Sequence, residues 1–397
     1  MVKKTAPSKK TAPSKQNSSS KQGSKKPSAP LETSSPALQS QEQQQRLLDI
    51  FSSAFNNVLT SPDFSRLLQE IKQALFNREF AAAFGREDYL EAYAARWSPT
   101  RALCYTAVFL SIKKHLDGIL IAKEETKHDT KITKERSASN TEITGPTQDD
   151  TNDKPEGTEL ENLQDLKLDS TSTRRNATLR MLSVGGCAAE HVAFASYLQT
   201  TATDGHLTLL DSGPWTTVIS LLESSTVNPP PISKYASTAR QAANHPLLEK
   251  NQLSLDVAQR DVLDLDMDSL SAQCANGRVP IILTLLFTLN ELYTTAGIGK
   301  TTRFLKNLGR VLASDSLVLV VDSPGSYSEA ALGKEKKRYP MQWLLDHTLI
   351  ETETPGYSWE KLQSDDSIWF RLPGGLSYPI PLENMRYQMH LYRLQKP

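Results

Sequence analysis

The feature that most constrains the fold is a strand, a glycine turn and a helix that follow one another over residues 178–198, TLRMLSVGGCAAEHVAFASYL. The apolar first part predicts the strand, and Gly185-Gly186 lets the backbone approach a ligand closely. The helix that follows would point its free N–H groups at that ligand. A second strand, 206–210, ends in Asp211, where a carboxylate can hold ribose hydroxyls. This stretch therefore predicts a nucleotide-binding unit.

The rest of the chain divides by composition into four parts. Lysine plus arginine equal aspartate plus glutamate, 45 each, so the net charge identifies no partner. Residues 1–40 are basic and polar, and 123–177 are charged with few large apolar side chains; both are expected to be disordered. The basic tail indicates nuclear import or attraction to nucleic acid, or only a solubilising extension. We expect a helical domain at 41–122 and an α/β domain at 178–397.

Cysteine and histidine usage excludes several classes of protein. The three cysteines lie far apart and the seven histidines are scattered, so the sequence predicts neither a disulfide framework nor a metal site. No apolar run approaches the ~18 residues that a membrane span needs, and no signal peptide is evident. We expect a soluble intracellular protein.

The helical part contains a group of residues that could contact RNA. The pair Ser98-Pro99 is a favourable N-cap and first helical position, so a helix is expected to begin there. Arg96, Trp97 and Arg101 would lie at its start, where arginines can hold phosphate and the indole can stack on a base. The alternative is a buried tryptophan beside solvated arginines.

From residue 178 onward, apolar runs typical of strands alternate with helical patterns. The expected strands end at Val184 and Asp211 and then cover 253–257, 279–288, 317–322, 367–372 and 385–394. The run at 279–288 is almost wholly apolar, as in a central parallel strand, whereas 385–394 alternates as an antiparallel strand does. The sequence thus predicts a doubly wound, mostly parallel, seven-stranded Rossmann-like α/β sheet with an N-terminal helical domain.

A phosphate-binding loop is a competing interpretation of residues 297–301, GIGKT. Such a loop requires a further glycine five positions before its last one, and Thr294 stands there. We therefore do not expect an NTPase, and Lys300 is interpreted as a solvated helix residue.

The order of elements over 178–397 resembles that of the class I S-adenosylmethionine-dependent methyltransferases. Their glycine motif, acidic-x-Gly-x-Gly-x-Gly, is matched at Gly185, while Ser183 replaces its acidic residue. The resemblance implies S-adenosylmethionine as cofactor, with Asp211 on the ribose and Asp261 on the adenine amino group; ordinary helix caps are the alternative. The candidate cofactor-binding residues are Ser183, Gly185, Gly186, Asp211, Asp261 and Thr288.

A narrower resemblance rests on five segments taken together. SVGGCAAEHVAFASYL, LLFTLNELY, VVDSPGSYSE, YPIPLENMRYQMHLYRLQ and RWSPTRAL look like the fungal 25S ribosomal RNA uridine-N3 methyltransferases. This resemblance implies N3-methylation of a uridine in 25S rRNA, with pre-60S particles as partners and no metal or membrane. It also implies a monomer in the nucleus or nucleolus, with the cytoplasm as a further location. The alternatives are a methyltransferase for proteins or small molecules, or a non-catalytic ribosome-assembly factor.

The candidate catalytic residues follow the fourth and fifth strands. Uridine N3 is a poor nucleophile until its proton is accepted, so a nearby carboxylate would help. Glu291 is the first candidate for that base and Asp322 the second, while Asn290 could hydrogen-bond the imide edge. In the alternative interpretation, Asn290 and Glu291 only begin the next helix.

Overall fold

The computed structural model describes residues 39–122 and 177–397, apart from positions 233, 243, 326, 333 and 334. The disordered tail predicted at 1–40 and the insertion predicted at 123–177 fall almost entirely outside the described residues. The domain boundaries predicted from composition stay a prediction.

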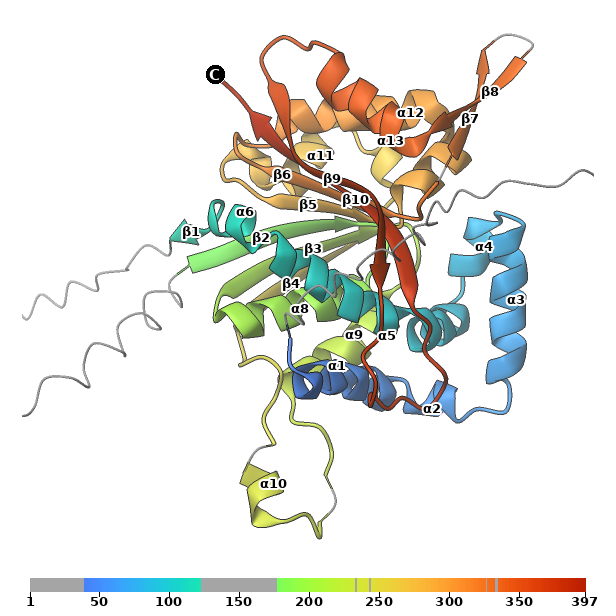
Figure 1. Cartoon of the computed structure of the whole chain (residues 1–397), viewed down its shortest axis with the longest axis vertical. Coiled ribbons are helices and arrows are strands. Elements are labelled where there is room, and N and C mark those ends of the chain that lie inside the picture. The colour runs from blue at the N-terminus through green and yellow to red at the C-terminus, as the bar shows by residue number, and fades with distance from the viewer. Residues whose placement is uncertain (1–38, 123–176, 233, 243, 326, 333–334) are drawn as a thin grey trace, which may run out of the picture. The chain divides into compact units, whose positions relative to one another are not determined.

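The sheet has the strand order β4-β3-β2-β5-β6-β10-β9, with a short β1 added beside β2 (Figure 1). Strands β2 to β6 run parallel, while β10 is antiparallel to both β6 and β9. The bounds are β1 (Ile121–Ala122), β2 (Ala177–Val184), β3 (Asp204–Asp211), β4 (Leu253–Gln259), β5 (Ile282–Leu286), β6 (Leu317–Asp322), β9 (Ser358–Phe370) and β10 (Met385–Gln395). This order confirms the predicted mostly parallel, doubly wound α/β sheet.

Helices cover both faces of the sheet because its central strands are apolar on both sides. All residues of β5 and β6 are buried. In β6, Leu317, Leu319 and Val321 belong to the core on the side of α5, α8 and α9, and Val318 and Val320 to the core on the side of α11, α12 and α13. Successive side chains of a strand point to opposite faces, so each core receives alternate residues.

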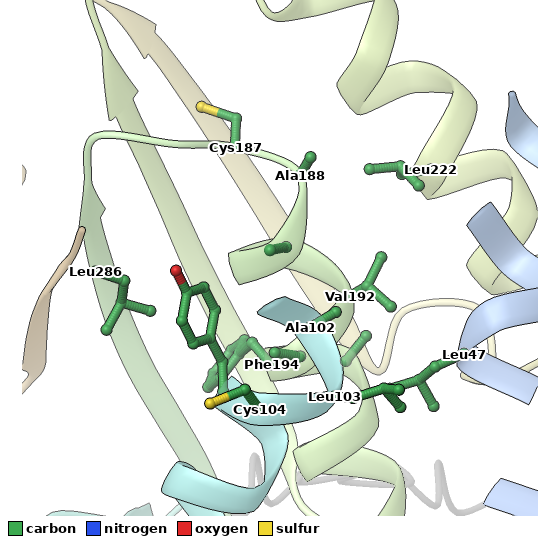
Figure 2. Packing of buried hydrophobic residues seen from close by; sticks show 14 of the residues in the cluster. Leu47, Ala102, Leu103, Cys104, Cys187, Ala188, Val192, Phe194, Leu222 and Leu286 are labelled. Atoms are coloured by element: carbon green, nitrogen blue, oxygen red, sulfur yellow. The ribbon is translucent and has the colours of Figure 1, made fainter. Parts of the chain in front are cut away.

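The helices before the sheet pack into the first of these two cores. Figure 2 shows Ala102 and Leu103 of α5 beside Val192 of α8. The bounds are α1 (Gln41–Ala54), α2 (Asn56–Leu59), α3 (Phe64–Phe76), α4 (Phe80–Phe84), α5 (Glu87–Ser111), α6 (Lys113–Asp117), α8 (Ala189–Thr201), α9 (Thr216–Val227), α10 (Thr238–Ala242), α11 (Met267–Gln273), α12 (Leu289–Val311) and α13 (Met341–Asp346). No helix in the described parts of the chain is long and apolar enough to cross a membrane.

The helix start expected at Ser98-Pro99 is wrong, because Pro99 lies in the middle of α5. Proline has no N–H, so the carbonyl of Ala95, four residues earlier, loses its helical partner. The hydroxyl of Tyr378 donates to that carbonyl at 2.7 Å. Ser98 is buried, and α5 continues past the proline with the missing hydrogen bond replaced from the loop between β9 and β10.

Two strand segments differ from the sequence-based expectation, because a hairpin follows β6 and β9 begins at Ser358 instead of at residue 367. The chain forms a hairpin of β7 (Tyr327–Leu332) and β8 (Glu335–Pro340) after β6, which was not expected.

Residues 297–301 lie inside α12, with a kink at Gly297 where φ is 82°. They therefore do not connect a strand to a helix, as a phosphate-binding loop must, and the exclusion of that motif agrees with the structure.

Candidate active site

A cavity of about 720 Å³ opens at the carboxyl ends of β2, β3 and β5. Helices α4 and α5 contribute to its wall, so the segment before the sheet helps to enclose it. Ligands of open parallel sheets bind at this edge, where loops leave the strands. The strand order alone thus makes the cavity the candidate site.

The glycine turn forms one wall of the cavity and can be built only from glycine. Gly185 and Gly186 have φ values of 76° and 86°, which side chains of L residues rarely tolerate. A Cβ on Gly185 would lie 2.4 Å from Cγ2 of Thr288, and one on Gly186 would lie 2.8 Å from Oε1 of Glu190. Thr288 also donates its hydroxyl to the Gly185 carbonyl at 3.3 Å. The predicted residues Gly185, Gly186 and Thr288 therefore meet at one place in the cavity wall.

Asp211 ties this turn to the end of β3. Its carboxylate accepts the N–H of Gly186 at 2.6 Å and the N–H of Gly213 at 2.7 Å. Burial raises the pKa of Asp211, with repulsion from Asp261 adding to the shift, although both N–H donors oppose it. Asp261 also lines the cavity and accepts the N–H of Leu263 at 2.9 Å. Both predicted carboxylates face the cavity, and both also cap local backbone.

Ser183 is not brought to the cavity. It is fully buried on β2, and its hydroxyl has no partner among the described residues. A different acidic side chain lies close to the glycine turn. Glu190, in the first turn of α8, folds back over Gly186. Glu190 is 4% exposed, and burial raises its pKa to about 7. The sequence signal for Glu190 is an acidic residue in the first helical turn after the glycines.

Glu291 and Thr288 both line the cavity. The other two catalytic candidates, Asn290 and Asp322, are not among its lining residues. Burial raises the pKa of Glu291 to about 7, and repulsion from Asp211 and Asp322 adds to the shift. The Asp322 carboxylate accepts the N–H of Asn290 at 3.0 Å, so Asp322 caps the start of α12. Glu291 is the one predicted catalytic residue that the described structure exposes to the cavity.

Only one of the three predicted RNA contacts reaches the cavity. Arg101 lines it, donates to the Tyr93 hydroxyl, and holds its guanidinium carbon 4.9 Å from the ring centroid of Phe287. Arg96 pairs with Glu383 in the loop after β9. Trp97 packs its ring 5.0 Å from that of Tyr93 and belongs to the margin of the core, which agrees with the alternative interpretation for this residue.

Aromatic side chains form much of the remaining wall. Phe84, Tyr93 and Trp215 contact one another, with ring centroids 5.1 to 6.4 Å apart. Phe287 has a φ of 61°, an unusual value for a bulky residue and a strain typical of functional sites. These aromatic residues were not predicted, because they come from α4, α5, α9 and the end of β5 and meet only in the folded chain.

The charges in the cavity suit a cationic ligand with an anionic end. The acidic residues in the described lining are Glu190, Asp211, Asp261 and Glu291, and the basic ones are Arg101 and Arg260. The glycine turn provides close backbone approach, and the aromatic rings provide a surface for a base. Within the described residues, no cluster of three His, Cys, Asp or Glu side chains could hold a metal ion.

Comparison with known proteins gives matches over most of the chain. A family model described as "Putative SAM-dependent methyltransferase" matches residues 51–393. The 25S rRNA (uridine(2843)-N(3))-methyltransferase of Saccharomyces cerevisiae is 26% identical over 361 residues, which cover 88% of this chain and 85% of that protein. Both findings agree with the resemblance predicted from the sequence.

Among the solved structures that match part of the chain are two that are named as methyltransferases. A SAM-dependent methyltransferase from Methanosarcina mazei is 10% identical, with a TM-score of 0.29, over 54% of this chain and 91% of that one. An S-adenosylmethionine-dependent methyltransferase from Clostridium acetobutylicum is 9% identical, with a TM-score of 0.27, over 58% and 88%. The fold assignment rests on the strand order described above.

Proposed function

Since the chain belongs to the family of S-adenosylmethionine-dependent methyltransferases, we propose that it methylates N3 of a uridine in large-subunit ribosomal RNA. One observation carries this proposal. The glycine turn, Asp211 and Glu291 line a single cavity in a chain that matches the yeast rRNA uridine-N3 methyltransferase over 88% of its length.

The residues in the cavity fit S-adenosylmethionine, which supplies a methyl group already activated by its sulfonium. The glycine turn lines the cavity, and its two glycines carry no side chain that would keep the backbone away from the cofactor. Asp211 would accept the ribose hydroxyls with lone pairs that its two N–H partners leave free. Glu190 and Arg101 would face the oppositely charged ends of the amino-acid part.

Glu291 is the proposed general base for uridine N3. A carboxylate with a pKa of about 7 is half ionised near neutral pH and still basic enough to accept a proton from an imide. The N3–H proton would pass to a Glu291 oxygen, which leaves an electron pair on N3 to accept the methyl group. The carbon–sulfur bond would break at the same time, and the sulfonium would leave as a neutral thioether. Asp322 would hold the start of α12 so that Glu291 keeps its position, because it binds the N–H of the preceding residue.

The target base must leave any helix before it reaches this site, because N3 lies on its Watson–Crick edge. Phe287 would receive the extruded base on the ring face that the Arg101 guanidinium leaves free. Stacking on an aromatic face is worth roughly 1–3 kcal/mol per base. These contacts would replace part of the stacking that the base loses when it leaves the RNA.

The substrate determines the expected partners and location. We propose that the protein acts as a monomer on pre-60S particles in the nucleus or nucleolus. The support is the activity for which the yeast relative is named and the basic composition of residues 1–40.

The proposal is tested with the full chain, S-adenosylmethionine and an unmodified transcript of the large-subunit rRNA. Mass spectrometry of the digested nucleosides should show N3-methyluridine, and the same nucleoside should be missing from rRNA of a strain that lacks the protein. Methylation of added protein in place of rRNA would favour a protein methyltransferase. Pre-ribosome association without any affinity for S-adenosylmethionine would instead favour an assembly factor.

A further inference from the structure

A tryptophan flanked by two arginines lies on the surface at the end of β9. Trp369 is 55% exposed. The guanidinium carbons of Arg371 and Arg386 lie 5.8 and 5.7 Å from its ring centroid. So exposed an indole adds little to the core, and both guanidinium groups lie within the distance of a cation–π interaction with it. We name Trp369, Arg371 and Arg386 the Trp369 cluster.

The strand register places the Trp369 cluster just beyond the catalytic edge of the sheet. Arg386 of β10 pairs with Trp369 of β9, and Gln388, two residues further along β10, pairs with Asp322 at the end of β6. Two residues of a strand span about 7 Å. Gln388 also donates to the carbonyl of Ser323 at 2.6 Å, which fixes this part of β10 against the end of β6.

Asp322 links this region to the cavity. Its carboxylate binds the N–H of Asn290, and the next residue, Glu291, lines the cavity. Asp322 therefore pairs with the strand that carries Arg386 and also holds the start of the helix that carries Glu291. Arg386 is also held in place, because its Nε donates to the Ser367 hydroxyl at 2.7 Å. An arginine whose orientation is already fixed loses less entropy when it binds.

We propose that the Trp369 cluster binds single-stranded RNA next to the nucleotide that enters the cavity. A base of this segment stacks on the Trp369 indole, and the guanidinium groups of Arg371 and Arg386 contact neighbouring phosphates. An aromatic face between cations matches the flat bases and anionic backbone of RNA. This inference rests on the proposed function, since it assumes an RNA substrate.

The test uses the full chain and an unmodified transcript of the large-subunit rRNA. Trp369→Ala should raise both the Kd for the transcript and the KM for methylation about tenfold, the usual size of the loss of one stacked base. Trp369→Phe should restore most of the affinity. The Kd for S-adenosylmethionine should stay unchanged, because Trp369 does not line the cavity.

Tyr235 provides a matched control. It is 85% exposed, and the Lys234 amine lies 5.0 Å from its ring centroid. It belongs to the loop that carries α10, away from β9 and β10 in Figure 1. Tyr235→Ala should leave the binding of the transcript unchanged.

Arg386→Gln tests the phosphate contact. The negative slope of log K for the transcript against log salt concentration should become shallower by about 0.7, as expected for the loss of one contact to single-stranded phosphate.

The two proposals fail in different ways. If the wild type forms N3-methyluridine and Trp369→Ala has the wild-type Kd and KM for the transcript, the role of the Trp369 cluster is overturned and the proposed function stands. If Trp369→Ala and Tyr235→Ala weaken RNA binding equally, the effect is not specific to the cluster and the inference is also overturned. If the wild type neither binds nor methylates rRNA, both proposals fail together.

Discussion

The Asp211 carboxylate and the Gly186 backbone N–H are joined by a 2.6 Å hydrogen bond between the end of β3 and the glycine turn after β2. The second Asp211 oxygen holds the N–H of Gly213. One side chain thus orients two turns that line the cavity. The carboxylate predicted to bind ribose is also the residue that shapes the turn for the cofactor.

Asp211→Asn should weaken S-adenosylmethionine binding by about tenfold or more, measured by calorimetry. The amide has almost the same shape, but its NH₂ group would face an N–H donor, and a charged hydrogen bond contributes about 1.5–3 kcal/mol. Asp264→Asn is the control, because the exposed Asp264 carboxylate does not line the cavity. A wild-type Kd for Asp211→Asn would contradict both roles assigned to Asp211.

Gly186→Ala should likewise reduce cofactor affinity at least tenfold. Alanine at a φ of 86° is strained, and its Cβ would lie 2.8 Å from the Glu190 carboxylate. Gly299→Ala is the control, since a Cβ there meets nothing within 4 Å and alanine favours the α12 helix. Equal cofactor affinity in the two variants would show that the glycine turn does not approach the ligand.

The pH dependence of kcat/KM should identify the base. The pKa of Glu291 is raised from 4.5 to about 7, so its ionised fraction increases about tenfold per pH unit below 7 and levels off above it. We expect kcat/KM to follow this curve, and Glu291→Gln to abolish the dependence together with most of the activity. Should Glu291→Gln keep the same profile, Glu190, whose pKa is also about 7, becomes the candidate.

The same two carboxyl groups should affect stability with the opposite sign. Because their pKa values are higher in the folded than in the unfolded chain, the folded state binds protons more tightly. Their contribution to the free energy of unfolding is complete below about pH 4.5 and is lost as the pH rises through 7. Urea denaturation of Glu190→Gln, without cofactor, should show a weaker decline over this pH interval than the wild type.

Tyr378→Phe should lower the free energy of unfolding by about 1 kcal/mol, because the Ala95 carbonyl inside α5 would lose its donor. Pro99→Ala supplies a backbone N–H that can bind the same carbonyl. In the Pro99→Ala background, the Tyr378→Phe loss should therefore shrink, which urea denaturation of the four proteins measures. Equal losses in both backgrounds would mean that the hydroxyl does not replace the missing helical bond.

Much of the fold could be predicted because its signals are local. The alternation of apolar runs with helical patterns predicted the sheet, and strand ends followed from where each run stopped at a glycine or an acid. Gly185, Gly186 and Asp211 were predicted to belong to one nucleotide-binding unit, and parallel strands bring their carboxyl ends to one edge. The resemblance to a known family then supplied the substrate, which no spacing in the chain encodes.

The sequence by itself therefore determined the type of sheet, the position of the glycine turn and the edge at which a ligand binds. Only the tertiary structure decided which polar residues face the cavity. Glu190 lines the cavity while Ser183 does not, and Arg101 enters the wall while Arg96 does not. Asp322 caps α12 instead of lining the site. The helix through Pro99 depends on a hydroxyl 283 residues away from Ala95. Such outcomes follow from contacts between distant segments, which periodicity and local propensity do not contain.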